Sequence, residues 1–379
     1  MIAKIKQIIC ISLVLFTFSV KAQNIVLGAE RTDTYLPLLK NKNVGVVANQ
    51  TSMIANTHLV DSLLSLEIDV VKVFSPEHGF RGKADAGAII EDGIDSKTGI
   101  PIISLYGNNK KPTREQLLGI DVLVFDIQDV GVRFYTYIST LHYVMEAAEN
   151  NIKVIVLDRP NPNGHYVDGP ILDTNFKSFV GMHPVPIVHG MTIGEYAKMI
   201  NGENWITTRC ELIVIEMENY THNTNYDLPI KPSPNLQNAR AVNLYPSLCL
   251  FEGTNISVGR GTDYPFQHFG APYLKSNYSF IPKSGEGSKY PKHEDIVCFG
   301  TDLRFQDNYL TTINLNWIIE AYKQCPEKEE FFNNFFNTLA GTDKLKKQII
   351  AGMTVREIKA SWQEGLEEFK RIRRKYLIY

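Results

Sequence analysis

The chain has 379 residues, a net charge of −2, and hydrophobic and aromatic fractions of 44% and 11%. This composition is typical of a globular protein and argues against intrinsic disorder. The nearly balanced charge also disfavours nucleic acid as a partner.

The first 22 residues predict an export signal rather than part of the fold. Lys4 and Lys6 precede a mostly apolar run over residues 8–20, and small residues before Gln23 offer a cleavage site. The apolar run is too short for a comfortable membrane span. We therefore expect a mature chain without a membrane span that is exported, to the periplasm or as a secreted protein.

The part of the chain after the signal is long enough for two domains, because a single hydrophobic core seldom grows to such a size. A change of character near Gly190 places the expected boundary there. We expect one domain over residues 23–190 and a second over residues 191–379.

Between residues 43 and 157 short apolar runs rich in β-branched residues alternate with amphipathic patterns. The runs predict strands at 43–48, 68–74, 100–105, 121–125 and 152–157. Helices are predicted at 57–66, just after Thr113 and at 139–150. This alternation predicts an α/β fold with a Rossmann-like, doubly wound parallel sheet.

The second half has a mixed pattern that predicts an α+β domain. Thr192 and Glu195 form a capping box that begins a helix, and a strand-like segment follows at 210–217. Residues 283–292 predict a surface loop, and the last seventy or so residues predict helices at 310–324, 327–339 and 354–376.

Polar side chains follow each of the four main predicted strands. The sequences after them are Asn49-Gln50-Thr51, Ser75-Pro76-Glu77-His78, Asp126-Ile127-Gln128-Asp129 and Asp158-Arg159-Pro160-Asn161. Because ligands bind beyond the carboxyl ends of parallel strands, we expect a site at this edge of the sheet. No phosphate-binding glycine motif is present, which disfavours a nucleotide, and no cofactor is expected.

Glu77 is the strongest catalytic candidate. It follows Pro76 in a tight turn, where apolar neighbours would raise the pKa of a carboxyl group and suit it to general acid catalysis. A structural interpretation, in which Glu77 pairs with Arg81 or caps the next helix, is equally compatible with the turn alone. The other polar strand ends favour a catalytic role, with His78 and Arg81 as supporting residues.

Residues 126–137 form a second group of candidates. Asp126 or Asp129 would provide the second carboxylate of a glycosidase, and Tyr135 or Tyr137 would provide a tyrosine nucleophile. Arg133 would lie on the same side as the two tyrosines if the segment is extended. The alternative is a structural ion pair between an aspartate and the arginine.

A third group surrounds Arg260, which stands between two glycines and shortly after Glu252 and Asn255. The glycines would allow a tight loop to present a guanidinium group to an anion. Taken alone, the loop is better explained as a hairpin turn with an exposed arginine.

A metal site is disfavoured by the spacing of the cysteines and histidines. Cys210, Cys249, Cys298 and Cys325 form no CxxC pair, and buried free thiols are favoured, although export would permit a disulfide. The histidines show no HExxH spacing, and no GxSxG motif indicates a serine hydrolase.

Several long motifs resemble the exo-β-N-acetylmuramidase family, also known as DUF1343. They are SPEHGFRG, FDIQDVGVRFYTYIST, LDRPNPNG, GMHPVPIVHGMTIGE, FEGTNISVGRGTDYPF and ASWQEGLEEF, and the resemblance extends from about Val26 to the end. It implies a glycoside hydrolase that releases terminal N-acetylmuramic acid from the non-reducing ends of peptidoglycan fragments, either muropeptides or disaccharides. It also implies a Rossmann-like domain, a smaller C-terminal domain and a cleft between them, with Glu77 as catalytic residue.

The resemblance gives the arginines a purpose, because N-acetylmuramic acid carries a lactyl carboxylate that Arg260 or Arg133 would bind. The catalytic candidates are thus Glu77, Asp126 and Tyr135. The substrate-binding candidates are Asn49, His78, Arg81, Gln128, Asp129, Arg133, Tyr137, Asp158, Arg159, Asn161, Glu252, Asn255 and Arg260. Two alternatives stay open: a non-catalytic periplasmic protein that binds amino sugars or muropeptides, and a metal-dependent amidase or esterase.

Overall fold

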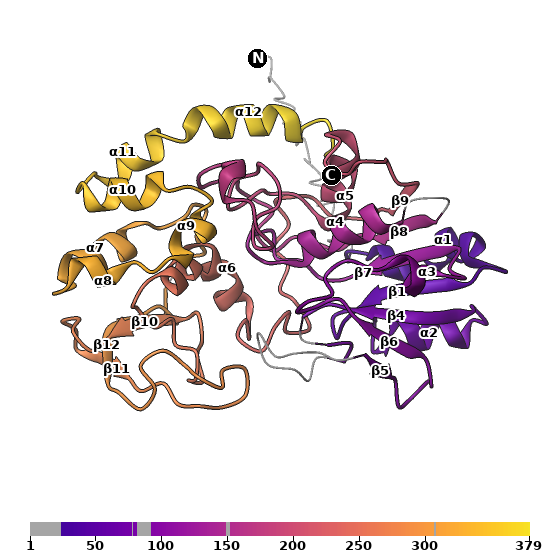
Figure 1. Ribbon diagram of the computed structural model, residues 1–379, viewed down its shortest axis with the longest axis horizontal. Coiled ribbons are helices and arrows are strands. Elements are labelled where there is room, and N and C mark those ends of the chain that lie inside the picture. Colours follow the sequence, from indigo (N-terminus) through magenta and orange to yellow (C-terminus); the bar gives the residue numbers. More distant parts are fainter. Residues whose placement is uncertain (1–23, 78, 82–91, 149–151, 307) are drawn as a thin grey trace, which may run out of the picture.

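The computed structural model describes residues 24–77, 79–81, 92–148, 152–306 and 308–379 (Figure 1). The expected export signal, residues 1–22, lies outside these residues, as does His78. No helix among the described residues has the length and apolar character needed to cross a membrane.

The N-terminal domain is built on a seven-stranded sheet. Its strands, in spatial order, are β5 (Gly93–Ile94), β6 (Pro101–Ser104), β4 (Val70–Ser75), β1 (Val44–Ala48), β7 (Val122–Asp126), β8 (Lys153–Leu157) and β9 (Leu212–Ile215). All neighbours from β6 to β9 are parallel, and β5 is antiparallel to β6. The order β6-β4-β1-β7-β8-β9 is that of a Rossmann-type sheet, so the predicted fold class is confirmed.

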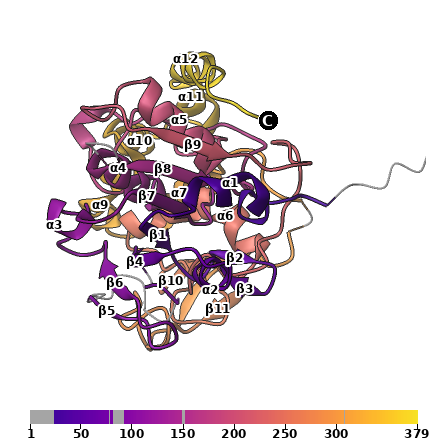
Figure 2. The same ribbon diagram turned by 90° about the vertical axis from the view of Figure 1, so that its right-hand side faces the viewer.

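Helices cover both faces of this sheet. The helices α1 (Thr32–Leu39) and α2 (Leu59–Ser65) lie on one face, and α3 (Arg114–Leu117), α4 (Tyr137–Ala147) and α5 (Ile193–Gly202) lie on the other (Figure 2). Side chains of β7 alternate between the two cores: Val122 and Val124 pack toward α1 and α2, whereas Leu123 and Phe125 pack toward α4 and α5. This alternation explains why the strands read as continuous apolar runs.

The sheet extends beyond the domain boundary expected at residue 190. Both α5 and β9 come later in the chain, and β9 pairs with β8 from Val154↔Leu212 to Leu157↔Ile215. The apolar sequence of β9 completes the sheet, so the segment after residue 190 belongs to the first domain. Short elements of the same half are η1 (Gly28–Glu30), β2 (Met53–Ile54), β3 (Thr57–His58) and η2 (Thr174–Phe176).

The C-terminal domain contains a small antiparallel sheet and a series of short helices. The sheet has the order β10 (His268–Ala271), β12 (Cys298–Asp302) and β11 (Tyr278–Phe280). The helices are α6 (Ala239–Leu248), η3 (Cys249–Gly253), α7 (Asn316–Gln324), α8 (Lys328–Phe331), α9 (Phe335–Ala340), α10 (Lys344–Ile350), α11 (Val355–Ala360) and α12 (Gln363–Arg373). Cys210, Cys249, Cys298 and Cys325 are buried free thiols, as predicted.

One apolar core runs through both domains. It includes Phe125 and Ile138 from the N-terminal domain and Leu244, Phe266 and Phe336 from the C-terminal domain. The domains are therefore packed together as one body rather than joined by a linker alone.

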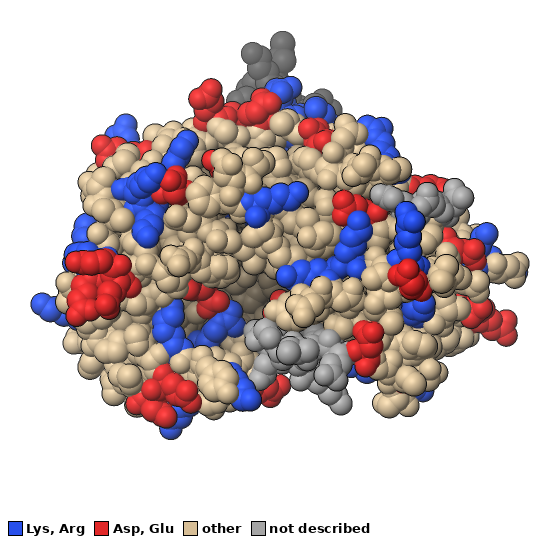
Figure 3. All heavy atoms as spheres, viewed as in Figure 1, with Lys and Arg blue, Asp and Glu red and all other residues tan. Residues whose placement is uncertain are grey.

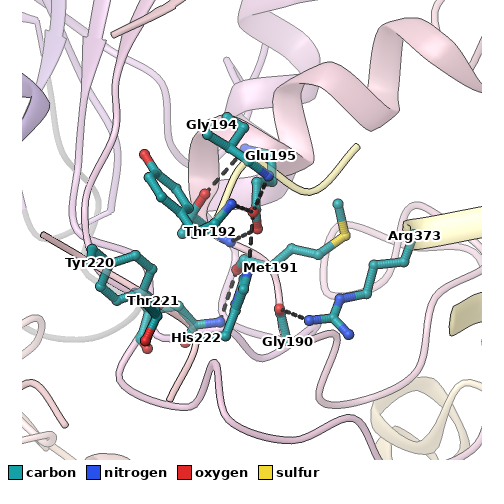
Figure 4. Close-up of polar contacts among 12 residues, drawn as sticks. Gly190, Met191, Thr192, Gly194, Glu195, Tyr220, Thr221, His222 and Arg373 are labelled. Carbon is teal, nitrogen blue, oxygen red and sulfur yellow. Dashed lines mark hydrogen bonds and ion pairs between the residues drawn. The ribbon is translucent and has the colours of Figure 1, made fainter. Parts of the chain in front are cut away.

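The last residues of the chain return to the N-terminal domain, with α12 crossing above both halves (Figure 1). Arg373 Nη2 donates to the Gly190 carbonyl at 2.7 Å, and Glu195 Oε1 accepts from the backbone of Ile378 at 2.8 Å and faces His222 Nε2 at 3.0 Å (Figure 4). The Tyr379 hydroxyl donates to Asp158 Oδ2 at 2.9 Å. The C-terminal segment thus closes onto the end of the parallel sheet.

Candidate active site

A pocket of about 220 Å³ lies between the two domains, beyond the carboxyl ends of the strands. The face drawn in Figure 3 is hollowed between the two halves, with acidic and basic side chains near the hollow. The pocket is lined by Glu77, Tyr106, Phe134, Tyr135, Thr136, Tyr137, Phe179, Val180, Ser233, Asn235, Leu236, Tyr245, Cys249, Glu252, Arg260, Phe266, Phe335 and Leu339. An aromatic wall with a few polar groups is the usual composition of a small-molecule site.

Glu77 reaches the pocket from the turn that follows β4. Gly79 has a φ of 78°, a backbone conformation that favours glycine and lets the turn reverse sharply. The Tyr106 hydroxyl donates to Glu77 Oε1 at 3.0 Å. Because β4 and β6 pair through Ser75 and Ser104, the residues that follow these strands lie side by side. Burial and the charge of Glu77 raise the pKa of Tyr106, so the phenol remains a hydrogen-bond donor.

Tyr135 and Tyr137 form part of the pocket wall, with ring centroids 4.9 Å apart. The Tyr135 hydroxyl donates to the Pro232 carbonyl at 2.7 Å. Burial raises the pKa of Tyr135 well above its ordinary value, and burial and the charge of Glu77 raise the pKa of Tyr137. A raised pKa disfavours the phenolate, so this environment suits hydrogen bonding better than nucleophilic attack.

Asn49 holds a fixed orientation at the end of β1. Its Oδ1 accepts from the backbone and the hydroxyl of Thr51, at 2.8 and 2.5 Å. Its Nδ2, like the hydroxyl of Tyr137, is buried and makes no hydrogen bond of good geometry with the residues that the structure describes. Asn49 is fully buried and does not line the pocket, so the expected ligand-binding role of this residue stays a prediction.

Glu252 and Arg260 bring a charged pair to the opposite wall. Arg260 Nε and Nη2 donate to the two carboxylate oxygens of Glu252 at 2.8 and 2.9 Å, and the guanidinium lies 5.0 Å from the centre of the Phe266 ring. Burial alone would raise the pKa of Glu252, but Arg260 lowers it below its ordinary value. Glu252 therefore remains ionised. Asn255 does not line the pocket, and its Oδ1 accepts from the Tyr273 hydroxyl at 2.6 Å.

Asp126 does not face the pocket. Its carboxylate is fully buried and accepts from Arg159 Nε and Nη2 at 2.5 and 2.8 Å, while the same Nη2 donates to the Met53 carbonyl at 3.0 Å. This is the structural ion pair that the sequence left as an alternative, although the partner is Arg159 rather than Arg133. Neither Asp126 nor Arg159 lines the pocket, so the catalytic role expected of Asp126 and the ligand-binding role expected of Arg159 have no support there.

Other polar residues at the strand ends hold the loops together. Gln128 Nε2 donates to the carbonyls of Asp129 and Pro160, and Asp129 Oδ2 accepts from the Gly131 amide. Asp158 accepts from the Gly194 amide at the start of α5, and Asn161 Nδ2 donates to the Met191 carbonyl. The sequence correctly predicted that these residues lie at one edge of the sheet, but their side chains make hydrogen bonds to other parts of the protein.

Arg81 and Arg133 are also committed to internal contacts. Arg81 Nε and Nη2 donate to Asp95 at 2.9 and 2.7 Å rather than to Glu77. Arg133 is fully buried, and its two terminal nitrogens donate to the carbonyls of Pro170, Val185, Leu339 and Ala340. Burial lowers the pKa of Arg133 to about 9. The buried guanidinium of Arg133 is not accessible to a substrate carboxylate, and the hypothesis that Arg133 binds this group is therefore not supported.

Of the predicted candidates, the pocket brings together Glu77, Tyr135, Tyr137, Glu252 and Arg260. Tyr106, Ser233, Asn235 and Tyr245 are lining residues that the sequence did not single out. Tyr106 had a usable signal, because it directly follows the strand predicted at 100–105. Among the described residues no cluster of three or more histidines, cysteines and acidic residues is arranged to hold a metal.

Residues 44–240 match the N-terminal domain of exo-beta-N-acetylmuramidase NamZ, and residues 243–379 match its C-terminal domain. The chain belongs to the exo-beta-N-acetylmuramidase NamZ family. The peptidoglycan beta-N-acetylmuramidase NamZ of Bacillus subtilis (strain 168) is 41% identical over an alignment of 377 residues. The match covers 92% of this chain and 90% of that protein.

Two crystal structures of DUF1343 family proteins from Bacteroides fragilis have the same fold. One is 48% identical with a TM-score of 0.88, and the other is 28% identical with a TM-score of 0.83; each match covers 94% of this chain and 99% of the other. The two matched family regions meet between residues 240 and 243, at the start of α6. Glu77 belongs to the N-terminal family region, and Glu252 and Arg260 belong to the C-terminal one, so the pocket lies where the two regions face each other.

Proposed function

We infer that this chain is an exo-acting β-N-acetylmuramidase, a glycoside hydrolase that releases terminal N-acetylmuramic acid from the non-reducing ends of peptidoglycan fragments. Membership of the family over nearly the whole chain supports the activity. The observation that carries the inference is the pocket itself. It joins a carboxyl group from one domain to an ionised carboxylate and an arginine from the other, within aromatic walls suited to a sugar ring.

Glycoside hydrolysis generally requires an acid that protonates the leaving oxygen and a second carboxylate that acts as base or nucleophile. Glu77 and Glu252 are the acidic side chains among the described residues of the pocket wall. We assign Glu77 as general acid, positioned by Tyr106. Glu252, kept ionised by Arg260, is the counterpart on the facing wall.

The test of Glu77 is turnover of a chromogenic N-acetylmuraminide by the wild type and by Glu77→Gln. Loss of a general acid lowers kcat by about 10²- to 10⁴-fold, whereas binding of N-acetylmuramic acid should persist because the shape of the pocket is kept. Glu364→Gln, at an exposed site on α12, is the control for substitution alone. Full turnover by Glu77→Gln would remove Glu77 from the mechanism.

The same assay separates the two alternative functions. A wild-type protein that binds the sugar without turning it over would be the non-catalytic binding protein. Turnover that disappears with a chelator and returns with added metal would indicate a metal-dependent amidase or esterase.

Arg260 is proposed as the group that recognises the lactyl carboxylate of N-acetylmuramic acid. It lines the pocket, and its Nε and Nη2 are used by Glu252, which leaves Nη1 to meet an anion. Loss of a charge-assisted hydrogen bond should reduce the preference for muramic over glucosamine glycosides by about 10- to 100-fold.

The measurement is the ratio of kcat/KM values for the two glycosides in Arg260→Ala. Arg304→Ala is a matched control, because Arg304 forms a similar pair with Asp302 and is absent from the pocket wall. An unchanged ratio in Arg260→Ala would show that the carboxylate is recognised elsewhere.

Export is a further proposal, which the N-terminal sequence supports. The enzyme would then meet wall fragments, as muropeptides or disaccharides, in the periplasm or outside the cell. N-terminal sequencing of the protein from a periplasmic or secreted fraction should begin at Gln23; a cytoplasmic protein that retains Met1 would contradict the proposal.

A further inference from the structure

The chain around Glu252 is held by the side chain of Lys292. The ammonium donates to the carbonyls of Phe251, Thr254 and Ile256, and the first and last of these hydrogen bonds measure 3.3 and 3.0 Å. One of the carbonyls precedes Glu252 in the chain and the other two follow it. A single side chain therefore fixes the backbone on both sides of the pocket carboxylate.

The two neighbours of this lysine contact the rest of the loop between Glu252 and Arg260. The His293 ring nitrogen Nε2 lies 2.7 Å from the Asn255 carbonyl. Pro291 packs against Gly261, the residue after Arg260, where an added side-chain carbon would come within 2.9 Å of the proline ring. The lysine and its neighbours therefore hold both ends of the loop that carries the charged pair.

The Lys292 ammonium uses its three N–H groups on uncharged carbonyl oxygens rather than on a carboxylate. The sequence predicted a surface loop over residues 283–292, in which a lysine would face water. Burial instead lowers the pKa of Lys292 to about 8, against the attraction of Glu252, so the ammonium stays charged in neutral and acidic solution. Burial also lowers the pKa of His293, which is therefore neutral beside it at neutral pH.

Glu252 is the acidic group on which the charge of Lys292 acts. Burial raises the pKa of Glu252, whereas Arg260 and then Lys292 lower it, and the result lies below the ordinary value. Burial raises the pKa of Tyr245 and Cys249, which also face Glu252, so both stay neutral. Among the described residues, Arg260 and Lys292 are thus the charges that stabilise the ionised form of Glu252.

We propose that Lys292 is a positioning residue of the active site. Its ammonium fixes the loop that presents Glu252 and Arg260 to the pocket, and it supplies the second positive charge that keeps Glu252 ionised. Lys292 does not line the pocket, so it acts through Glu252 rather than on the substrate. This inference rests on the proposed function, in which Glu252 is the counterpart of Glu77.

Three substitutions separate the charge of Lys292 from its hydrogen bonds. Lys292→Arg keeps a charge and donors, Lys292→Gln keeps donors without the charge, and Lys292→Met keeps neither. Lys289→Met is a control that removes an exposed lysine from the same loop. Asn333→Ala is a second control, because Asn333 Nδ2 donates to the Glu252 carbonyl at 3.2 Å and carries no charge. Thermal unfolding shows which variants fold.

The measurement is the pH dependence of kcat and KM for a chromogenic N-acetylmuraminide. Loss of a positive charge near Glu252 disfavours its ionised form, so the acidic limb of kcat/KM should move to higher pH. We expect a shift of about half a unit or more in Lys292→Gln and Lys292→Met. At the optimum kcat should fall about 10-fold or more, with KM within about 3-fold of wild type. The arginine variant and both controls should keep the acidic limb of the wild type.

An acidic limb that stays in place in folded Lys292→Gln would overturn the proposal, and so would an equal shift in Lys292→Arg. A protein that folds only with a charged residue at this position would overturn it as well, because Lys292 would then serve the fold rather than the site. A wild-type protein that does not turn over the glycoside would instead refute the proposed function, and the two failures are thereby distinguished.

Discussion

Asp129 keeps its carboxyl group in the protein interior, in the segment between β7 and α4. Gly131 N donates to one carboxylate oxygen at 2.6 Å, and His189 Nε2 stands 4.0 Å from the same atom. Burial raises the pKa of Asp129 to about 7, more than the backbone hydrogen bonds lower it. Burial lowers the pKa of His189 to about 3, so neither group is charged in mildly acidic solution.

This environment predicts a pH-dependent stability. A carboxyl group that titrates near 7 in the folded protein and near 4 in the unfolded chain contributes stability at low pH, and that contribution is lost as the pH rises through about 7. Asp129→Asn does not titrate. Between about pH 5 and about pH 8 the free energy of unfolding of the wild type should therefore fall relative to that variant, by on the order of 2 kcal/mol.

Urea denaturation at several pH values measures this difference, with Asp227→Asn as a control at an exposed position. Curves for the wild type and Asp129→Asn that stay parallel over this pH range would contradict the shifted pKa.

For single residues, the sequence predicted which kinds of chemical group lie near the site better than it predicted what each side chain contacts. Glu77 and Arg260 were predicted correctly as pocket residues because the neighbouring glycines and proline indicate a turn in the local sequence. Asp126 and Arg133 were misassigned because a charged residue that is satisfied inside the protein has the same local pattern as one that faces a ligand. The carbonyl partners of Arg133 lie 37 to 207 residues away in the chain, a distance that local patterns do not reach.

Among the elements, α5 has an N-terminus that serves both the helix and the sheet. The Thr192 hydroxyl accepts from the Glu195 amide at 3.2 Å and donates to Asp158 Oδ2 at 2.8 Å. Glu195 Oε2 in turn accepts from the Thr192 amide at 2.9 Å, which completes the capping box that the sequence predicted. One threonine thus connects the start of α5 to the end of β8.

Thr192→Val should lower the free energy of unfolding by about 1 to 3 kcal/mol, because it removes the cap and leaves Asp158 with one donor fewer. Thr192→Ser keeps the hydroxyl and should recover most of that loss. Chemical denaturation of both variants measures the effect. Equal stability of the valine and serine variants would show that the hydroxyl does not matter.

The strands were predicted more accurately than the helices for a physical reason. Strands buried on both faces have continuous apolar sequences with polar ends, so each strand of the parallel sheet was located within a few residues. The long helix predicted at 354–376 is instead two helices, α11 and α12, separated at Ser361 and Trp362. An apolar stripe persists across such a break, and therefore its periodicity does not reveal the break.

For the molecule as a whole, the relation between the domains determines the shape of the site. Their shared core and the two contacts of Arg133 with the Leu339 and Ala340 carbonyls bind the halves together. The periodicity of apolar residues does not show which domain a helix or strand belongs to. The boundary expected at residue 190 therefore separated α5 and β9 from the sheet to which they belong.

Arg133→Met should destabilise both domains together. The substitution leaves the carbonyls of Pro170, Val185, Leu339 and Ala340 without their donor in the interior, at a cost of about 3 to 5 kcal/mol. Differential scanning calorimetry should show one unfolding transition in the wild type, moved to lower temperature in the variant. Arg209→Met, at an exposed position, is the control.

Two resolved transitions in the wild type, with only one of them shifted in Arg133→Met, would contradict the single cooperative unit.

The bond between Asp158 and Tyr379 joins residues 221 positions apart. During synthesis on the ribosome Asp158 emerges long before Tyr379, because every strand of the parallel sheet precedes Tyr379 in the chain. The N-terminal domain therefore cannot complete its own polar contacts before Tyr379 has emerged. An N-terminal half expressed alone would lack a contact that Tyr379 provides.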